Sequence, residues 1–356
     1  MAEVALTNSQ LAELCARAAA AEERGSHRRR ALDRAAHAAL AWPEPAAALR
    51  AADRQLTHLA AVGPWIAERL AEWLDGGEPP DPALTPPARQ GFSSLAEARA
   101  LLASAPDWAG RLRGDLQMHT TWSDGRVDLP EMVAAALEHG PGYDYIAITD
   151  HTKGLTIANG MDEARLSRQA ETVGVVRAAL AAAGRAQQVL HAVEMNLSPL
   201  GEGDMENWAL VRLDLVLGAF HSSLREPADQ TERYLRAVRN PTIDVLAHPR
   251  TRRWDTRPGL QADWRRVFEA AADSGVAVEL DGHPHRQDLD VETARTAVET
   301  GVLFSIGSDA HHPDELVGVE LALAAALGAA VPPERIIAFR SGRPVERPRA
   351  AALLGG

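Results

Sequence analysis

Short apolar runs alternate with helical patterns over the last two thirds of this 356-residue chain. The runs are rich in Val, Ile and Leu, and amphipathic stretches rich in Ala, Leu and Arg separate most of them. Such alternation is typical of strands joined by crossover helices, and it predicts an α/β fold with a parallel sheet of about seven strands. The expected strands lie at 112–118, 145–149, 189–193, 213–220, 243–247, 276–280 and 302–306.

Side chains of metal-ligand type follow the ends of these runs. In a parallel barrel the carboxyl ends of all strands open at one mouth, where such side chains would meet. An open doubly wound sheet would leave the ends of its flanking strands too far apart for one cluster. The pattern therefore favours a closed barrel, in which the candidate ligands are Gln117, His119, Asp124, His151, Glu194, His221, His248, Asp309 and His311.

The candidate ligands also indicate which metals the site would hold. Imidazole and carboxylate groups suit zinc, manganese or iron(II). The only cysteine, Cys15, lies in a helical pattern far from these residues in the sequence. Because the ligands outnumber the positions around one tetrahedral ion, we expect two or three ions, which together can activate water and polarise a phosphoryl oxygen.

Six short motifs carry a family resemblance. They lie, in order, at 114–125, 148–153, 193–194, 221–222, 247–249 and 308–311. Together they resemble the successive motifs of the PHP (polymerase and histidinol phosphatase) domain. The runs 149–154 and 281–289 resemble, more narrowly, the PHP domain at the C-terminus of bacterial family X DNA polymerases. The resemblance implies a distorted (β/α)7 TIM-like barrel with a trinuclear metal site.

The resemblance further implies roles for individual residues. Glu194 would bridge two metals, a hydroxide would attack a phosphate ester, and Asp309 or His311 would move a proton. Gln117 departs from the family pattern, since most members have histidine there. The implied metal sites are Gln117, His119, Glu194 and Asp309; Asp124, His151 and His311; and Glu194, His221 and His248.

Three cationic residues near the same strand ends, Lys153, Arg252 and Arg286, are candidates for binding substrate phosphate. A solvated surface role is the alternative for each of them. We expect Asp150 to be a hydrogen-bond acceptor that orients a ligating histidine, rather than a ligand itself.

The N-terminal part of the chain has a different pattern. Residues 8–75 are nearly all helix-patterned, and 59–70 resembles a helix-hairpin-helix motif. In that motif the backbone N–H groups of a hairpin bind a DNA phosphate, which would place Gly63 and Trp65 at a DNA contact. Ala61 stands where the hairpin usually has its first glycine, so a helical packing module without DNA binding is the alternative.

The pattern changes give the expected domains. A helix-hairpin-helix domain over 1–77 resembles the small N-terminal domain of family X polymerases, a proline-rich linker spans 78–110, and the PHP barrel spans 111–345. The linker leaves no room for a polymerase core and contains no strand with paired aspartates. The chain therefore resembles a family X polymerase that lacks its polymerase.

Composition and charge bear on the cellular location of the protein and on its binding partners. A single cysteine argues against a disulfide framework, and the chain has neither an apolar run of membrane-spanning length nor a signal-like N-terminus, so we expect a cytoplasmic protein. The net charge of -12 weighs against strong nonspecific binding to duplex DNA. Acidic metal ligands contribute to that charge and are neutralised when metal binds.

The leading functional hypothesis is a metal-dependent phosphoesterase that acts on DNA ends, as a 3′-5′ exonuclease or a 3′-phosphatase. One alternative is a phosphatase of small metabolites of the histidinol-phosphate type. A second is a non-catalytic DNA-binding protein with a vestigial metal site. The nearly complete ligand set disfavours this last alternative, because drift would remove isolated histidines first.

Overall fold

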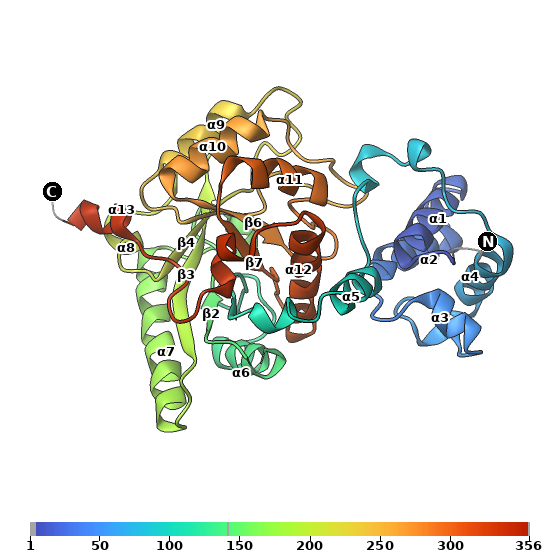
Figure 1. Cartoon of the computed structure of the whole chain (residues 1–356), viewed down its shortest axis with the longest axis horizontal. Helices are drawn as coiled ribbons and strands as arrows, with labels where there is room; N and C mark the ends of the chain where they lie inside the picture. The colour runs from blue at the N-terminus through green and yellow to red at the C-terminus, as the bar shows by residue number, and fades with distance from the viewer. Residues whose placement is uncertain (1–4, 141, 355–356) are drawn as a thin grey trace. The chain divides into compact units, whose positions relative to one another are not determined.

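The computed structural model describes residues 5–140 and 142–354 of the chain. Its residues divide into two compact units, whose elements are labelled in Figure 1. The helical unit comprises Met1–Ser104 and Arg253–Pro258, and the barrel unit comprises Ala105–Arg252 and Gly259–Gly356. Within the described parts of the chain, no helix is both long enough and apolar enough to cross a membrane.

The barrel unit is built on seven parallel strands, each paired with the next in chain order. The last strand returns to the first, since Leu116 N donates to Ile306 O at 3.2 Å and Met118 forms a parallel bridge with Ala310. The predicted (β/α)7 TIM-like barrel is confirmed. The strands are β1 Gly114–Asp115, β2 Tyr145–Ile148, β3 Gln188–Leu197, β4 Leu215–Phe220, β5 Val245–Leu246, β6 Ala277–Asp281 and β7 Phe304–Gly307.

Helices cover the outside of the strands, which explains why nearly every strand residue is buried. Aspartates at four helix starts accept a hydrogen bond from the backbone N–H three residues later, which stabilises these starts. The principal helices of the unit are α6 Leu129–His139, α7 Glu163–Ala182, α8 Asn207–Leu210, α9 Thr231–Arg239, α10 Trp264–Ser274, α11 Val291–Thr300, α12 Val319–Gly328 and α13 Pro348–Ala351.

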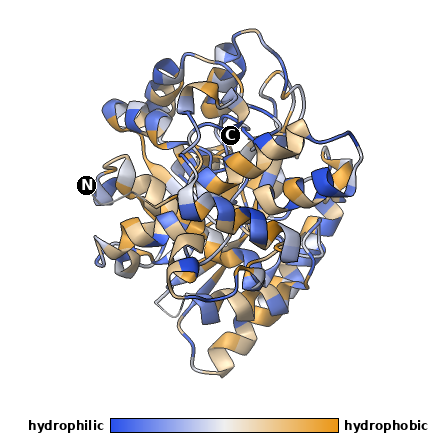
Figure 2. Cartoon of the chain, turned by 90° about the vertical axis from the view of Figure 1, so that its right-hand side faces the viewer, coloured by the Kyte–Doolittle hydropathy of each residue, from blue (hydrophilic) through white to orange (hydrophobic). Residues whose placement is uncertain are grey.

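The helical unit has its own apolar core, to which four of its described helices contribute residues. Trp42 is fully buried there and donates its indole N–H to Ala60 O at 3.0 Å. Trp254, from the segment Arg253–Pro258, belongs to the same core. Hydrophobic and hydrophilic residues alternate along the helices, as amphipathic packing requires (Figure 2). The helices are α1 Asn8–Ala21, α2 His27–Ala39, α3 Ala46–Ala51, α4 Pro64–Gly76 and α5 Leu95–Ala103.

The interval expected to be a linker, 78–110, contains two short 3₁₀ turns, helix α5 and the start of a third 3₁₀ turn, Ala109–Arg111. Leu95 and Leu102 of this helix are buried, and its start carries a capping box between Ser94 and Glu97. The compact units divide between Ser104 and Ala105. The structure thus shows two compact units. The division into a helix-hairpin-helix domain, a linker and a barrel domain stays a prediction.

The hairpin before α4 contains a left-handed residue at an unusual position. Ala61 has φ +61°, a conformation that disfavours a residue with a Cβ atom. Gly63, by contrast, has φ −83° and caps α4, and a Cβ added there would meet no atom within 4 Å. Position 61, rather than position 63, therefore has the backbone conformation that favours glycine in this hairpin.

We expect Ala61→Gly to stabilise the helical unit by about 0.5–1 kcal/mol, because relief of the left-handed strain exceeds the extra entropy of glycine in the unfolded chain. Urea denaturation monitored by circular dichroism measures the change. Ala31→Gly, within α2, is the matched control and should destabilise by about 1 kcal/mol. Destabilisation by both substitutions would contradict the strain at position 61.

Candidate metal centre

The predicted ligands converge on Glu194, which is fully buried in β3. Its side chain lies inside the barrel, and each of its two carboxylate oxygens faces two imidazoles. This arrangement allows one carboxylate to bridge two cations. The ring nitrogens are His221 Nε2 at 3.0 Å and His248 Nε2 at 2.8 Å from Oε1, and His119 Nε2 at 3.3 Å and His151 Nδ1 at 3.4 Å from Oε2.

A second group of ligands surrounds Asp124, in the loop after β1. Asp124 Oδ1 lies 3.6 Å from His151 Nε2 and 3.4 Å from His311 Nε2. The ring of His119 stacks between those of His151 and His311, with centroids 4.5 and 4.3 Å away. One donor atom from each of these four residues lies within 4.8 Å of the others. This group is open on one side, because 36% of the Asp124 side chain is exposed.

The third group contains Asp309 and Gln117. Asp309 Oδ1 lies 3.2 Å from His119 Nε2, and with Glu194 these residues form another set of closely spaced donors. The amide nitrogen of Gln117 donates to Glu194 Oε2 at 3.0 Å, and its buried Oε1 has no hydrogen-bond partner among the described residues. Rotation of the amide by half a turn would direct that oxygen at the cluster, so Gln117 can serve as a ligand.

The buried polar atoms of the cluster fit a set of cations. Ring nitrogens of His119, His151 and His221 that face the cluster are buried and lack a hydrogen-bond partner within residues 5–140 and 142–354. A buried polar atom without a partner is costly, and coordination to a metal would satisfy it. The nine predicted ligands thus lie in one cluster, and their assignment to individual ions remains a proposal.

Burial and charge act in opposite directions on the imidazoles. Burial lowers the pKa of His151 to about 3 and lowers the pKa of His248, so both rings are neutral and able to ligate at neutral pH. Burial also acts to lower the pKa of His119, but the carboxylates of Asp309 and Glu194 outweigh it and raise this pKa well above its ordinary value. In the metal-free protein His119 therefore holds a proton.

Metal uptake should release a proton at neutral pH, because His119 must become neutral before it ligates. The apparent affinity for metal should accordingly rise with pH and fall on acidification. Calorimetric titration in two buffers with different ionisation enthalpies measures the number of protons released. Uptake without proton release at pH 7 would contradict the assignment of His119.

The three cations expected to bind phosphate lie in different surroundings. Arg286 reaches the cluster, with Nε 3.1 Å from Asp309 Oδ2 and a fifth of its side chain exposed. Lys153 is more exposed and pairs with Glu163 at 2.7 Å. Arg252 is buried, and its guanidinium donates to Asp290 Oδ2 at 2.8 Å. These contacts favour a structural role for Arg252 and leave Arg286 as the cation best placed to meet a substrate.

Asp150 has a different role from the one expected. It is buried and accepts hydrogen bonds from Thr120 N at 2.8 Å and Ser123 Oγ at 2.6 Å, rather than from a ligating histidine. It therefore holds the loop that carries His119 and Asp124. Asp150 thus orients these two candidate ligands through the loop, rather than through a hydrogen bond to an imidazole.

Two supporting residues were missed by the sequence analysis. Gln169 of α7 donates to Asp150 Oδ2 at 2.6 Å, and nothing in its helical pattern indicates this contact. Glu279 accepts from His248 N at 2.7 Å and is fully buried in β6. A glutamate within the otherwise apolar run 276–280 was a signal that could have identified it.

The residues expected to contact DNA belong to the helical unit. Gly63 lies at the start of α4, where the helix exposes its first backbone N–H groups. Trp65 packs partly against the apolar core, and the Arg28 guanidinium lies 5.5 Å from the centre of its ring. Their contact with DNA stays a prediction.

Comparison with known proteins agrees with this geometry. The chain is 35% identical over 238 residues to the DNA polymerase/3′-5′ exonuclease PolX of Bacillus subtilis (strain 168), a match that covers 67% of this chain and 41% of the relative. The chain is homologous to PolX. A probable phosphatase of Aliivibrio fischeri (strain ATCC 700601 / ES114) is 31% identical over 169 residues, covering 44% of this chain and 64% of the relative.

The chain thus spans less than half the length of PolX and less than two thirds of the length of the phosphatase. No family model matches it. Among solved structures, histidinol phosphate phosphatase from Lactococcus lactis, complexed with zinc, L-histidinol and phosphate, aligns with a TM-score of 0.45 at 14% identity, over 61% of this chain and 93% of that one. The putative histidinol phosphatase of Listeria monocytogenes aligns with a TM-score of 0.44 at 13% identity, over 57% and 97%.

Proposed function

We propose that the protein is a metal-dependent phosphoesterase whose reaction takes place at the mouth of the barrel. The observation that carries this proposal is the position of Glu194, buried between four imidazoles and grouped with one further carboxylate of ligand type, that of Asp309. Such a cluster is expensive to bury without cations. The names of the relatives, an exonuclease and a probable phosphatase, support hydrolysis of a phosphate ester.

The cluster residues would hold two or three divalent cations, which supply Lewis-acid chemistry by lowering the pKa of water and neutralising developing charge. Arg286 would bind the phosphate, because its partly exposed guanidinium lies beside Asp309. Asp309 is buried and engaged by both Arg286 and His119. His311 keeps a fifth of its side chain exposed, which favours it over Asp309 as the group that moves a proton.

For the substrate we propose DNA ends, processed as by a 3′-5′ exonuclease or a 3′-phosphatase. The support is the similarity to PolX, whose name includes the 3′-5′ exonuclease activity, and a match that covers two thirds of this chain. The helical unit, with its hairpin before α4, would provide a sequence-independent contact to the phosphate backbone.

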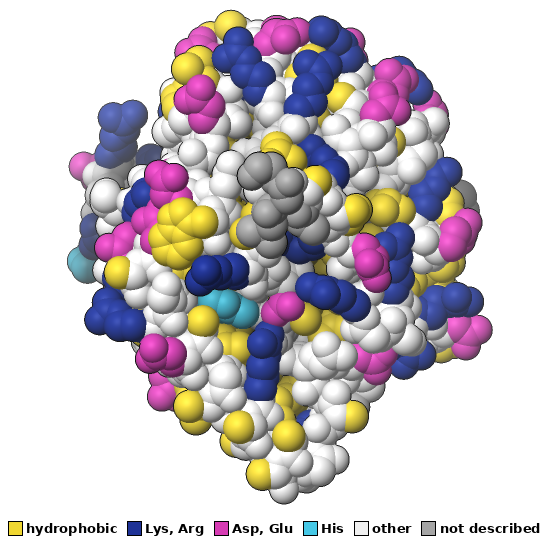
Figure 3. Space-filling model, turned by 90° about the vertical axis from the view of Figure 1, so that its left-hand side faces the viewer, with side chains coloured by type: hydrophobic (Ala, Val, Ile, Leu, Met, Phe, Trp, Pro, Cys, Tyr) yellow, Lys and Arg dark blue, Asp and Glu magenta, His cyan; other side chains and the backbone are white. Residues whose placement is uncertain are grey.

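The second candidate substrate is a small phosphomonoester. The similarity to a probable phosphatase supports it, and so does the net charge of -12. Figure 3 shows one face of the molecule on which acidic and basic side chains are interspersed rather than gathered by sign. That face offers no continuous positive surface for a nucleic acid.

A side-by-side assay distinguishes the candidates. Manganese- or zinc-loaded protein is given single-stranded DNA, 3′-phosphorylated DNA and histidinol phosphate, and kcat/KM is measured for each. We expect a DNA substrate to be preferred, with turnover that declines as salt rises, because backbone contacts release counterions. Faster hydrolysis of histidinol phosphate with no salt dependence would favour the metabolite phosphatase, and no turnover of any substrate would favour the non-catalytic alternative.

A further inference from the structure

The segment 333–341 crosses the amino ends of the barrel strands. Ile336 forms a parallel bridge with Phe304 at the start of β7. Ala338 O accepts a hydrogen bond at 2.8 Å from the backbone N–H of Arg113, which directly precedes β1. Since the candidate metal ligands follow or end the strands, this segment lies at the opposite end of the barrel from the metal centre.

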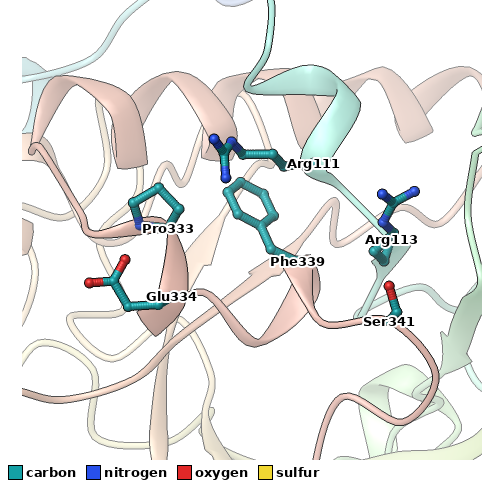
Figure 4. A pocket seen from close by; sticks show the side chains of 6 residues that line it. All are labelled: Arg111, Arg113, Pro333, Glu334, Phe339 and Ser341. Carbon is teal, nitrogen blue, oxygen red and sulfur yellow. The ribbon is translucent and has the colours of Figure 1, made fainter.

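A cavity of about 420 Å³ opens beside this segment. Its size falls within the range of sites for small organic ligands. In Figure 4, Arg111 and Phe339 lie in the middle of the cavity lining, with Glu334 on one side and Arg113 and Ser341 on the other. Pro333 completes the lining, so cationic, aromatic, acidic and hydroxyl groups border one space.

The two arginines of the cavity are available to a ligand. Several other arginines of the barrel unit have carboxylate partners, as Arg177 has Asp214 at 2.6 Å. The guanidinium groups of Arg111 and Arg113, in contrast, make no hydrogen bond or ion pair with any residue that the structure describes. An unpaired guanidinium in a concave surface favours an anion, and its planar donors match the oxygens of a phosphate.

Phe339 gives the cavity a fixed aromatic surface. Its ring contacts Trp108 edge to face, with centroids 5.6 Å apart, and its backbone N–H donates to Ile336 O at 3.1 Å. A flat heterocycle can stack on such a ring, whatever its hydrogen-bonding pattern.

We propose that this cavity binds a nucleoside monophosphate. Its phosphate would bind Arg113 with the Ser341 hydroxyl as a further donor, and its base would stack on Phe339, beside Arg111. Inorganic phosphate would leave Phe339 without a partner, and a nucleoside would leave Arg113 without one. The site is independent of the metal centre and of the reaction proposed for it.

The first test is calorimetric titration of the metal-free, full-length protein with AMP in the presence of EDTA. Chelation removes phosphate binding by the metal centre, so heat reports the cavity alone. We expect AMP to bind, and adenosine and inorganic phosphate to bind at least about 10-fold more weakly, since each lacks half of the contacts. Absence of binding at millimolar AMP would overturn the proposal, and so would equal affinity for inorganic phosphate.

Substitutions then locate the bound nucleotide. Arg113→Met should weaken AMP binding about 10-fold or more through loss of a charge-assisted contact, and Phe339→Leu about 5-fold through loss of stacking. Arg168→Met, on the exposed side of α7, is the matched control and should leave the affinity unchanged. Unchanged affinity in both cavity variants would overturn the proposal.

Circular dichroism verifies that each variant is folded. If Arg113→Met does not fold, Arg111→Met at an exposed position provides the same comparison. Because the titration uses metal-free protein, failure of the nucleotide site leaves the phosphoesterase proposal intact. If the protein bound AMP but hydrolysed no phosphate ester, the nucleotide site would stand and the phosphoesterase proposal would fail.

Discussion

Glu194→Gln should remove at least one metal ion per chain and lower phosphoester turnover about 100-fold or more. The carboxylate lies within 3.4 Å of four imidazoles, and each of its oxygens serves two of them. A neutral amide has one acceptor oxygen and carries no charge, so it cannot bridge two cations. Elemental analysis and a phosphoesterase assay on the same preparation measure both effects.

Glu171→Gln is the control for this experiment, because Glu171 is an exposed residue of α7. It should retain the metal content and turnover of the unmodified protein. If Glu194→Gln also retained both, the carboxylate would not be a bridging ligand and the centre would have to be built from the remaining residues.

Arg252→Ala should destabilise the protein by about 1.5–3 kcal/mol, because it removes a buried charge-assisted hydrogen bond to Asp290 and leaves that carboxylate to Arg250 alone. Only 4% of the Arg252 side chain is exposed, and its guanidinium donates to Asp290 while its backbone N–H donates to Asp288. Thermal and urea denaturation measure the loss. Asp290 also caps α11, so the start of that helix would lose support as well.

Arg168→Ala is the control for stability and should change it by less than about 0.5 kcal/mol, as expected for an exposed position. If Arg252→Ala left the stability unchanged and raised the KM for a phosphate ester while kcat was retained, Arg252 would bind substrate, as the sequence suggested.

The alternation of apolar runs and helical patterns was sufficient to predict the barrel, although not the length of each strand. The run 112–118 contains only the two-residue strand β1, and the run 189–193 belongs to a strand that continues to Leu197. Glu194 therefore lies within β3 rather than after it. Strand ends depend on pairing with neighbours, here with β4 as far as Phe220, and that pairing is not encoded in the local pattern.

The cluster itself could be predicted because its residues have ligand chemistry and follow strands that share one end. The supporting contacts could not be predicted, since a hydrogen bond such as that from Gln169 to Asp150 depends on where a helix packs. Arg252 shows the same limit, because its sequence position resembles that of Arg286 while its burial is very different. The cavity with Arg111 and Phe339 joins segments more than two hundred residues apart.

The metal content of the reconstituted full-length protein tests the central claim most directly. The protein is loaded with zinc or manganese at neutral pH, freed of excess metal and analysed by elemental mass spectrometry. It should contain two to three ions per chain, because the ligands exceed the capacity of one ion. A content of one ion or none would contradict the multinuclear centre.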